Sequence, residues 1–408
     1  MSMAKAHKVF EGLKVLDFGR IITGSLVSEY LAMHGATVVK VESFRVPDRL
    51  RFSTPYKDRR GGLNRSGYFS LYNANKFSLV LDLDHARAKD MVKRLVLWCD
   101  VLVENLAPGA MEKRGFGYED VKRMKPDIIM LSASNMGRSG PFSSFRGFGY
   151  TLMALTGFTS LTGWPDRVPS HPFGALADFI APCLATIVLI GALEYRRRTG
   201  KGQYLDVSQY ECSLLLLSPV LLDYIINGRE LSRKGNRCPH AAPHGAYPCK
   251  GEDRWCVIAV ESEEEWLAFC NLIGKPEMAR DARFCDLRRR KENETELDET
   301  IALWTKGKSA EEIMDMLQGA GLTAGVVQNP ADIFQDPQLI FRNHFQMLEH
   351  PEMGYHNYEM PPFRLSSTPA KLNRPAPCIG QDNEYVCRQL LCMEDDEFIS
   401  LLNEGVFE

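Results

Sequence analysis

Short apolar segments alternate with amphipathic helical segments along the first half of the chain, and this alternation constrains the fold more than any other feature. The strand-like runs occupy residues 12–18, 36–42, 77–83, 100–105, 127–134 and 202–208. Amphipathic helical segments, such as residues 86–99, lie between them. Strands that are apolar almost throughout must be covered on both faces, as in parallel sheets flanked by helices. The sequence therefore predicts an α/β fold with such a sheet.

The character of the sequence changes after Asn227. Residues 227–254 are polar, basic and rich in turn formers, and a strand at 255–260 and two helical segments follow. From Asn329 onward, long irregular stretches dominate, and so long a tail is expected to wrap over another domain or subunit. We therefore predict a large domain at 1–226, a smaller α+β domain at 227–328, and a C-terminal segment at 329–408 that returns to the large domain.

Composition excludes several classes of protein. The 49 Lys and Arg residues nearly balance the 52 Asp and Glu residues, so there is no basic excess to bind nucleic acid. The eleven cysteines include no CxxC pair, which argues against a disulfide framework and a structural zinc site. The N-terminus lacks the apolar core of a signal peptide, and the longest apolar run, 179–193, is shorter than the roughly 20 residues of a membrane span. These features predict a soluble cytoplasmic protein with no membrane partner.

The motifs of the common cofactor and hydrolase sites are missing from the sequence. The first predicted strand leads into GRIITG at 19–24, which lacks the GxGxxG fingerprint of dinucleotide sites, so a nicotinamide-dependent oxidoreductase is disfavoured. Walker, HExxH and GxSxG motifs are absent as well. No metal ligand is predicted.

One carboxylate has an unusual setting. Asp178 stands between a segment rich in Gly and Ala and a long apolar helix expected at 179–198. It could simply cap that helix by accepting hydrogen bonds from backbone N–H groups. It could also present a nucleophilic carboxylate near the carboxyl edge of a parallel sheet. Spacing alone leaves both interpretations open.

The sequence resembles the class III coenzyme A transferases, which include formyl-CoA, carnitine-CoA and bile-acid-CoA transferases, along essentially its whole length. The segments that carry the resemblance follow the family's order: FEGLKVLDFGR at 10–20, GATVVKVE at 35–42, NKFSLVLDLD at 75–84, and the stretches 100–129, 191–211 and 235–255. The resemblance implies a large Rossmann-like domain, a smaller α+β domain, and two subunits interlocked as a homodimer or as a heterodimer with a related chain.

The resemblance also implies a reaction. In the family an aspartate before the long helix is the nucleophile, and Asp178 is the matching position. Attack on an acyl-CoA thioester gives a mixed anhydride, CoA thiolate then gives an aspartyl-CoA thioester, and the acceptor carboxylic acid reverses the sequence. An Asp with a pKa near 3.9 is already ionised at neutrality, so no general base is needed. The CoA thioester is a substrate, and no tightly bound cofactor is implied.

The resemblance assigns CoA contacts to individual positions of this chain. The residues matched to the nucleotide and the pantetheine arm are Ile22, Thr23, Leu81, Asn105, Leu106, Ser134 and Asn135. Leu81 could equally be an ordinary core residue. Lys113, with Arg114 beside it, stands where relatives direct an Arg toward the CoA phosphates. Ser43 departs from the pattern, because some relatives have a phosphate-binding Arg there.

The acid substrates are less constrained by the sequence. Region 227–254 lacks the glycine run of formyl-CoA/oxalate relatives, so a one- or two-carbon acid is disfavoured. A larger or aromatic acid is favoured by three apolar residues near the site, Phe148, Tyr150 and Phe173. A second carboxylate could be held by Arg138, Arg146 or Arg237. Succinyl-CoA as donor and benzylsuccinate as acceptor fit this description.

Two alternatives stay within the same family fold. The chain could be a non-catalytic partner subunit that only binds CoA. This alternative is disfavoured because the chain retains Asp178, which such a subunit would not need. The 2-methylacyl-CoA racemases pair the shared aspartate with a His, since moving an α-proton needs two acid–base groups. Phe148 occupies the position of that His, so a racemase is the less favoured alternative.

Overall fold

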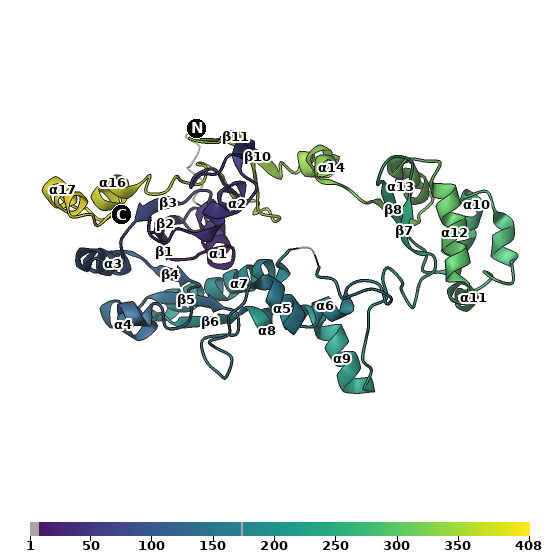
Figure 1. The fold of residues 1–408 in the computed structure, drawn as a ribbon, viewed down its shortest axis with the longest axis horizontal. Helices are drawn as coiled ribbons and strands as arrows, with labels where there is room; N and C mark the ends of the chain where they lie inside the picture. The colour runs from purple at the N-terminus through teal and green to yellow at the C-terminus, as the bar shows by residue number, and fades with distance from the viewer. Residues whose placement is uncertain (1–7, 173) are drawn as a thin grey trace. The chain divides into compact units, whose positions relative to one another are not determined.

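The computed structural model describes residues 8–172 and 174–408, and the chain divides into two compact units (Figure 1). Unit 1 comprises residues 1–159, 171–230 and 340–408, as far as they are described. Unit 2 comprises residues 160–170 and 231–339.

A six-stranded parallel sheet forms the centre of unit 1. Its strands, in chain order, are β1 (Lys14–Asp17), β2 (Thr37–Glu42), β3 (Phe77–Val80), β4 (Val101–Glu104), β5 (Ile129–Ser134) and β6 (Tyr204–Ser208). They lie in the order β3-β2-β1-β4-β5-β6, and every neighbouring pair is parallel. The predicted α/β class and its parallel sheet are confirmed.

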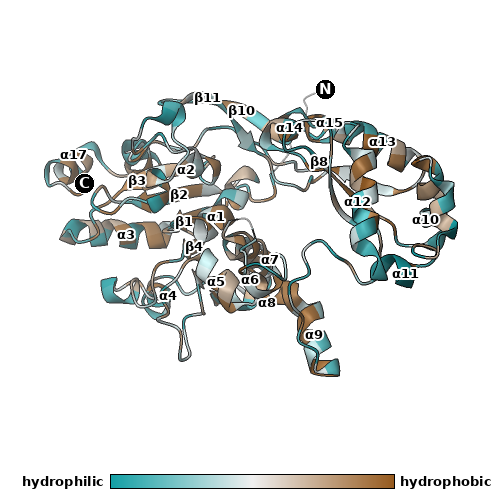
Figure 2. Ribbon diagram, turned by 45° about the vertical axis from the view of Figure 1, so that its right-hand side comes forward, coloured by the Kyte–Doolittle hydropathy of each residue, from teal (hydrophilic) through white to brown (hydrophobic). Residues whose placement is uncertain are grey.

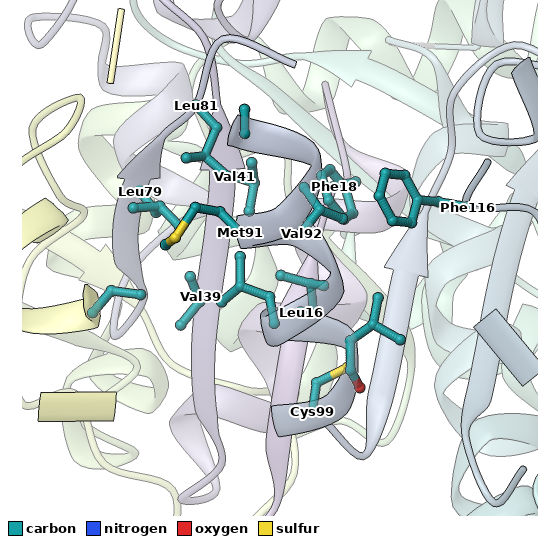
Figure 3. Packing of buried hydrophobic residues seen from close by; sticks show 14 of the residues in the cluster. Leu16, Phe18, Val39, Val41, Leu79, Leu81, Met91, Val92, Cys99 and Phe116 are labelled. Carbon is teal, nitrogen blue, oxygen red and sulfur yellow. The ribbon is translucent and has the colours of Figure 1, made fainter. Parts of the chain in front are cut away.

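Alternate side chains of the strands enter two different cores. Leu16 packs with residues of α3 (Ala86–Trp98), α4 (Tyr118–Met124) and the C-terminal segment, in the cluster that Figure 3 shows. Val15, its neighbour in β1, packs with residues of α1 (Thr23–Met33) and α7 (Leu176–Thr199). Since successive strand residues point to opposite faces, this division explains why both faces are apolar.

The C-terminal segment is more regular than predicted. The antiparallel strands β10 (Phe345–His350) and β11 (Gly354–Glu359) form a hairpin, and α16 (Asn383–Tyr385) and α17 (Asp395–Asn403) follow. Tyr358 anchors the hairpin: its ring is buried, and its hydroxyl accepts a 2.7 Å hydrogen bond from Ser70 Oγ in α2 (Gly67–Leu71). The prediction of irregular structure is wrong at 345–359, because these strands carry mostly polar side chains and lack a clear apolar pattern, and it is confirmed at 361–380, which contain no helix or strand.

Unit 2 is an α+β unit with its own core. Its sheet is antiparallel, in the order β7 (His244–Pro248), β8 (Trp255–Ala259) and β9 (Thr323–Val326). Its helices are α10 (Glu263–Leu272), α11 (Leu287–Glu292), α12 (Glu294–Thr305), α13 (Ala310–Gly319) and α14 (Pro330–Gln335). Trp266 and Phe269 of α10 stack in the core with ring centroids 5.9 Å apart.

Helical segments of unit 1 leave apolar residues exposed. The segments Leu176–Thr199 and Gln209–Asn227 are long and apolar enough to cross a membrane, which by itself is a weak indication, and 33% and 17% of their apolar windows are buried. The second segment contains α8 (Gln209–Leu214) and α9 (Ser218–Asn227), and α9 is largely hydrophobic in Figure 2. The prediction of a buried core helix at 179–193 holds for one face only, because Ile187 and Val188 are exposed.

Candidate functional site

A large cavity of unit 1 lies at the carboxyl edge of the parallel sheet. It has a volume of about 950 Å³ and is bordered by residues that follow β1, β4, β5 and β6. The strand order reverses between β1 and β4, since β2 and β3 lie on one side of β1 and β4 to β6 on the other. Open α/β sheets bind ligands in the crevice at such a point.

Most of the residues predicted from the family resemblance lie in the wall of this cavity. They are Asp178, Ile22, Thr23, Asn105, Leu106, Lys113, Ser134 and Asn135. Leu81 is fully buried in the hydrophobic core, and the guanidinium of Arg114 donates to the Ala110 carbonyl oxygen at 3.1 Å; neither residue is among those described as lining the cavity. The CoA contacts themselves remain predictions.

The turn after β1 forms one wall and is held by paired hydrogen bonds. Asn105 Oδ1 accepts from the backbone N–H of Arg20 at 2.7 Å, and Asn105 Nδ2 donates to the Arg20 carbonyl oxygen at 2.8 Å. Lys40 Nζ donates to the Gly19 carbonyl oxygen at 2.6 Å from beneath the turn. Because Lys40 and Asp17, which accepts from Gly19 N–H, are fully buried, this wall has a rigid base.

The same turn contains a strained residue. Ile21 has φ +60°, a conformation that a β-branched side chain rarely adopts. Asp48 Oδ1 accepts a 2.9 Å hydrogen bond from the Ile21 N–H, and Asp48 Oδ2 lies 3.0 Å from Lys40 Nζ. The buried Asp48–Lys40 pair therefore fixes the backbone where it borders the cavity.

Asp178 lies in the first turn of α7 and does not cap the helix. The N-cap position is Ala175, and no side chain caps the helix there, so the capping interpretation of Asp178 and the predicted start of the helix at 179 are wrong. Burial raises the pKa of Asp178 to about 6, and a hydrogen bond from Gln209 opposes the rise. A carboxyl with this pKa is still mostly ionised at neutral pH, but a larger fraction of it is protonated than for an Asp with the ordinary pKa of about 3.9.

Gln209 is the first residue of α8, immediately after β6, and is buried. Its Nε2 donates to Asp178 Oδ1 at 3.1 Å and also to Thr23 Oγ1. An amide nitrogen carries two hydrogens, so both donors are used. Gln209 thereby joins the nucleophile candidate to the turn after β1.

Gly149 permits the close approach of a second backbone segment to Asp178. It begins α5 (Gly149–Leu155), and a Cβ placed on it would lie 2.8 Å from Asp178 Oδ2 and would also collide with the Cβ of Ala175. Any side chain would therefore displace Asp178 or the start of α7. The carboxylate consequently has two different sides, with Oδ1 beside Gln209 and Oδ2 beside Gly149.

Cationic side chains lie in the cavity wall and next to it. Burial lowers the pKa of the Arg20 guanidinium; Asp48 and Glu42 oppose this shift, and the nearby Arg114 and Arg49 add to it. Arg49 lines the cavity and lies 5.9 Å from the centre of the Phe148 ring. Such a group of cations is suited to an anionic ligand.

Ser134 adds an unsatisfied group to the wall. Its Oγ is buried and has no hydrogen-bond partner among the described residues. A buried hydroxyl without a partner is costly, and a polar ligand in the cavity could supply one.

The residues considered for the acid substrate fall in different places. Arg146 and Phe148 line the cavity. Arg138 forms an ion pair with the buried Glu104, so its charge is already compensated. Arg237 belongs to unit 2, where its Nε lies 3.3 Å from Glu294 Oε2. Phe173 lies outside the described residues.

No cluster of three or more His, Cys, Asp or Glu side chains that could hold a metal ion occurs within residues 8–172 and 174–408. The cavity instead offers one carboxylate, amide and hydroxyl groups, and several cations. These groups suit nucleophilic chemistry on an anionic substrate.

Sequence reasoning missed three residues of this site. Gln209, Arg49 and Gly149 belong to no cofactor motif, and none was matched to a family contact. One signal was available for Gln209, because it directly follows the predicted strand 202–208, and the carboxyl ends of parallel strands share one edge. Gly149 becomes meaningful only when α5 and α7 are seen side by side.

The chain is similar to known CoA-transferases in sequence and to a CAIB/BAIF family protein in structure. The profile described as CoA-transferase family III matches residues 10–383. A probable CoA-transferase of Mycobacterium tuberculosis is 34% identical over 97% of this chain, which spans about half the length of that relative. The succinyl-CoA–D-citramalate CoA-transferase of Chloroflexus aurantiacus is 30% identical over 98% of both chains. Among solved structures, a CAIB/BAIF family protein from Brucella suis superposes with a TM-score of 0.87 at 29% identity, covering 94% of this chain and all of that one.

Proposed function

The chain belongs to CoA-transferase family III, and we propose that it moves CoA from an acyl-CoA donor to a carboxylic acid with Asp178 as the nucleophile. The observation that carries the proposal is the position of Asp178 in the wall of the cavity, with Oδ1 held by Gln209. A carboxylate with a pKa of about 6 is ionised at neutral pH and more basic than an exposed Asp.

The proposed reaction passes through two enzyme-bound intermediates. An oxygen of Asp178 attacks the thioester carbonyl carbon, the C–S bond breaks, and a mixed anhydride and CoA thiolate result. The thiolate then attacks Cγ of Asp178, the donor acid leaves as a carboxylate, and an aspartyl-CoA thioester remains. The acceptor acid attacks the same carbon, and the reverse steps transfer CoA to it. Each step exchanges one acyl linkage for another, so the sequence needs neither a metal nor ATP.

We propose that the cavity holds the CoA part of the substrate. Lys113, Arg49 and the nearby Arg20 would face its phosphates, since cationic side chains form strong charge-assisted hydrogen bonds with phosphate oxygens. Ser134 and Asn135 would contact the pantetheine arm, and the unpartnered Ser134 hydroxyl supports this assignment.

We propose succinyl-CoA as the donor and an acid with a second carboxylate as the acceptor. The name of the Chloroflexus relative supports the donor. Arg146, an exposed cation of the cavity wall, could hold the second carboxylate, and the Phe148 ring favours a larger or aromatic acid such as benzylsuccinate. Parallel assays with benzylsuccinate and citramalate would decide between a large and a small acceptor.

We propose that the enzyme works in the cytoplasm as an interlocked dimer, either of two copies or with a related chain. The exposed apolar residues of α7 and α9 support a partner, because contiguous apolar surface commonly marks an interface. They include Ile187, Ile190, Leu222, Ile225 and Ile226. Measurement of the solution mass tests this proposal, and a monomer at micromolar concentration would overturn it.

Covalent trapping tests the function. After incubation with succinyl-CoA, hydroxylamine should modify the peptide that contains Asp178, and Asp178→Asn should abolish both the modification and turnover. Labelling elsewhere in the chain, or turnover that survives in Asp178→Asn, would overturn the assignment of the nucleophile. A chain that binds CoA but is never labelled would instead be the non-catalytic partner subunit.

A further inference from the structure

The two oxygens of the Asp178 carboxylate have different surroundings. Gln209 Nε2 lies 3.1 Å from Oδ1, whereas Oδ2 lies beside Gly149, which has no side chain. The orientation of the Gln209 amide is fixed by chemistry, because an ionised carboxylate only accepts hydrogen bonds and must therefore face the nitrogen. The second N–H of the same nitrogen donates to the buried Thr23 Oγ1, so the amide is held on both sides.

From this geometry we propose that Gln209 is a catalytic residue that stabilises the oxyanion formed on Oδ1 whenever Cγ of Asp178 is attacked. The inference rests on the function proposed above and deepens it. With Oδ1 held by Gln209, Oδ2 is the oxygen free to attack the substrate and to become the bridging atom of the anhydride.

The second attack takes place on the mixed anhydride that Asp178 has formed with the donor acid. The CoA sulfur, as a thiolate, forms a bond to Cγ, and the π electrons of the Cγ–Oδ1 bond move onto Oδ1. The tetrahedral anion collapses, the Cγ–Oδ2 bond breaks, and the donor acid leaves as a carboxylate that carries Oδ2. No proton is transferred, and no oxidant or reductant is required. The negative charge appears only on Oδ1, to which Gln209 already donates.

Gln209 does not assist the first attack, in which Oδ2 of Asp178 attacks the acyl-CoA. In that step the oxyanion forms on the substrate, and negative charge leaves the Asp178 carboxylate. The hydrogen bond from Gln209 then stabilises the starting state more than the transition state, so it does not accelerate this step. Removal of Gln209 should therefore slow the attack on Cγ selectively.

The test uses the full-length protein with succinyl-CoA as the probe. In rapidly quenched samples of the unmodified protein, intact mass spectra should show the aspartyl-CoA thioester. In Gln209→Leu, turnover should fall by about 10²-fold, the loss expected for one oxyanion donor, and the succinyl adduct should accumulate relative to the thioester. Gln209→Met, which has nearly the same shape, covers the case in which the leucine variant does not fold.

Gln318→Met is the matched control, because the Gln318 amide donates at 2.9 Å to the Ala324 carbonyl oxygen within unit 2. It should retain full turnover and the normal ratio of adducts. If both adducts decline together in the Gln209 variants, or if turnover changes less than twofold, the role of Gln209 is refuted while the nucleophile stands. If the unmodified protein forms neither adduct on Asp178, the proposed function fails, and the role of Gln209 fails with it.

Discussion

Asp48 Oδ1 accepts a hydrogen bond of 2.9 Å from the backbone N–H of Ile21, the β-branched residue that the turn after β1 holds at φ +60°. A strained backbone conformation of this kind persists only where several surrounding contacts hold it in place, and such conformations are concentrated at functional sites. Here the surroundings include Lys40, whose Nζ lies 3.0 Å from the other Asp48 oxygen; both side chains have no exposed surface. The turn that borders the cavity thus depends on a buried ion pair.

Asp48→Ala should therefore destabilise the protein and weaken binding of acyl-CoA. Removing one partner leaves the Lys40 ammonium buried without the carboxylate that it pairs with, and breaking a buried pair in this way typically costs about 3–5 kcal/mol. Denaturant unfolding and the KM for succinyl-CoA measure the two effects. Asp90→Ala, which removes an exposed ion pair with Lys93, is the control and should change stability by less than about 1 kcal/mol. Equal stabilities of the two variants would contradict the role of the pair.

Asp178→Asn should make the protein more stable while it abolishes activity. Burial raises the pKa of Asp178 to about 6, so the ionised carboxylate is less favourable in the folded protein than in the unfolded chain. Each pKa unit corresponds to about 1.4 kcal/mol, and a neutral amide should therefore gain about 1–3 kcal/mol at pH 7. Thermal unfolding tests the gain, which should vanish below about pH 4, where both states of Asp178 are protonated. A variant less stable at pH 7 would contradict this account.

Much of the fold could be predicted from the sequence. The strands of the parallel sheet are apolar on both faces, and such runs leave a strong signal; all six predicted segments contain a strand. Unit 2 shows where the signal weakens. Residues 286–296 are highly charged and lack an apolar pattern that predicts a helix, yet they form α11 and the start of α12, and the buried Arg290 pairs there with Glu263 at 2.8 Å.

The site could be predicted only in part. Asp178 and seven other residues of the cavity wall follow from the family resemblance, whereas Gln209 and Gly149 are recognised only by their distances to Asp178, which no local pattern encodes. The sequence predicts too late a start for α7, because an Asp before an apolar helix is typical of an N-cap. In the structure that position is taken by Ala175, whose side chain has no polar atom to give such a signal.

The rate of transfer should depend on the ionisation of Asp178. A protonated carboxyl cannot attack, so kcat at saturating succinyl-CoA should fall as the pH drops through about 6 and level off above about 7. Burial, and then the charge of Asp178, raise the pKa of Tyr68, so this neighbouring phenol stays neutral in this range. In Gln209→Met the fall in kcat should occur at a higher pH, because the variant loses the Gln209 hydrogen bond that lowers the pKa of Asp178. An unchanged pH profile would contradict the contact between Gln209 and Asp178.

Gly149→Ala should abolish activity by displacing the nucleophile. The added Cβ would lie 2.8 Å from Asp178 Oδ2 and would also meet Ala175, so either the first turn of α7 or the start of α5 must move. Misplacement of a reacting group by about 1 Å can cost about 10²-fold in rate, and we expect at least that loss in kcat. Gly319→Ala is the matched control: Gly319 ends α13 in unit 2, and a Cβ there meets no atom within 4 Å. It should leave kcat unchanged and, since Ala favours the helix, stabilise the protein by up to about 1 kcal/mol. If Gly149→Ala retained full activity, the close approach of α5 to Asp178 would have no part in the reaction.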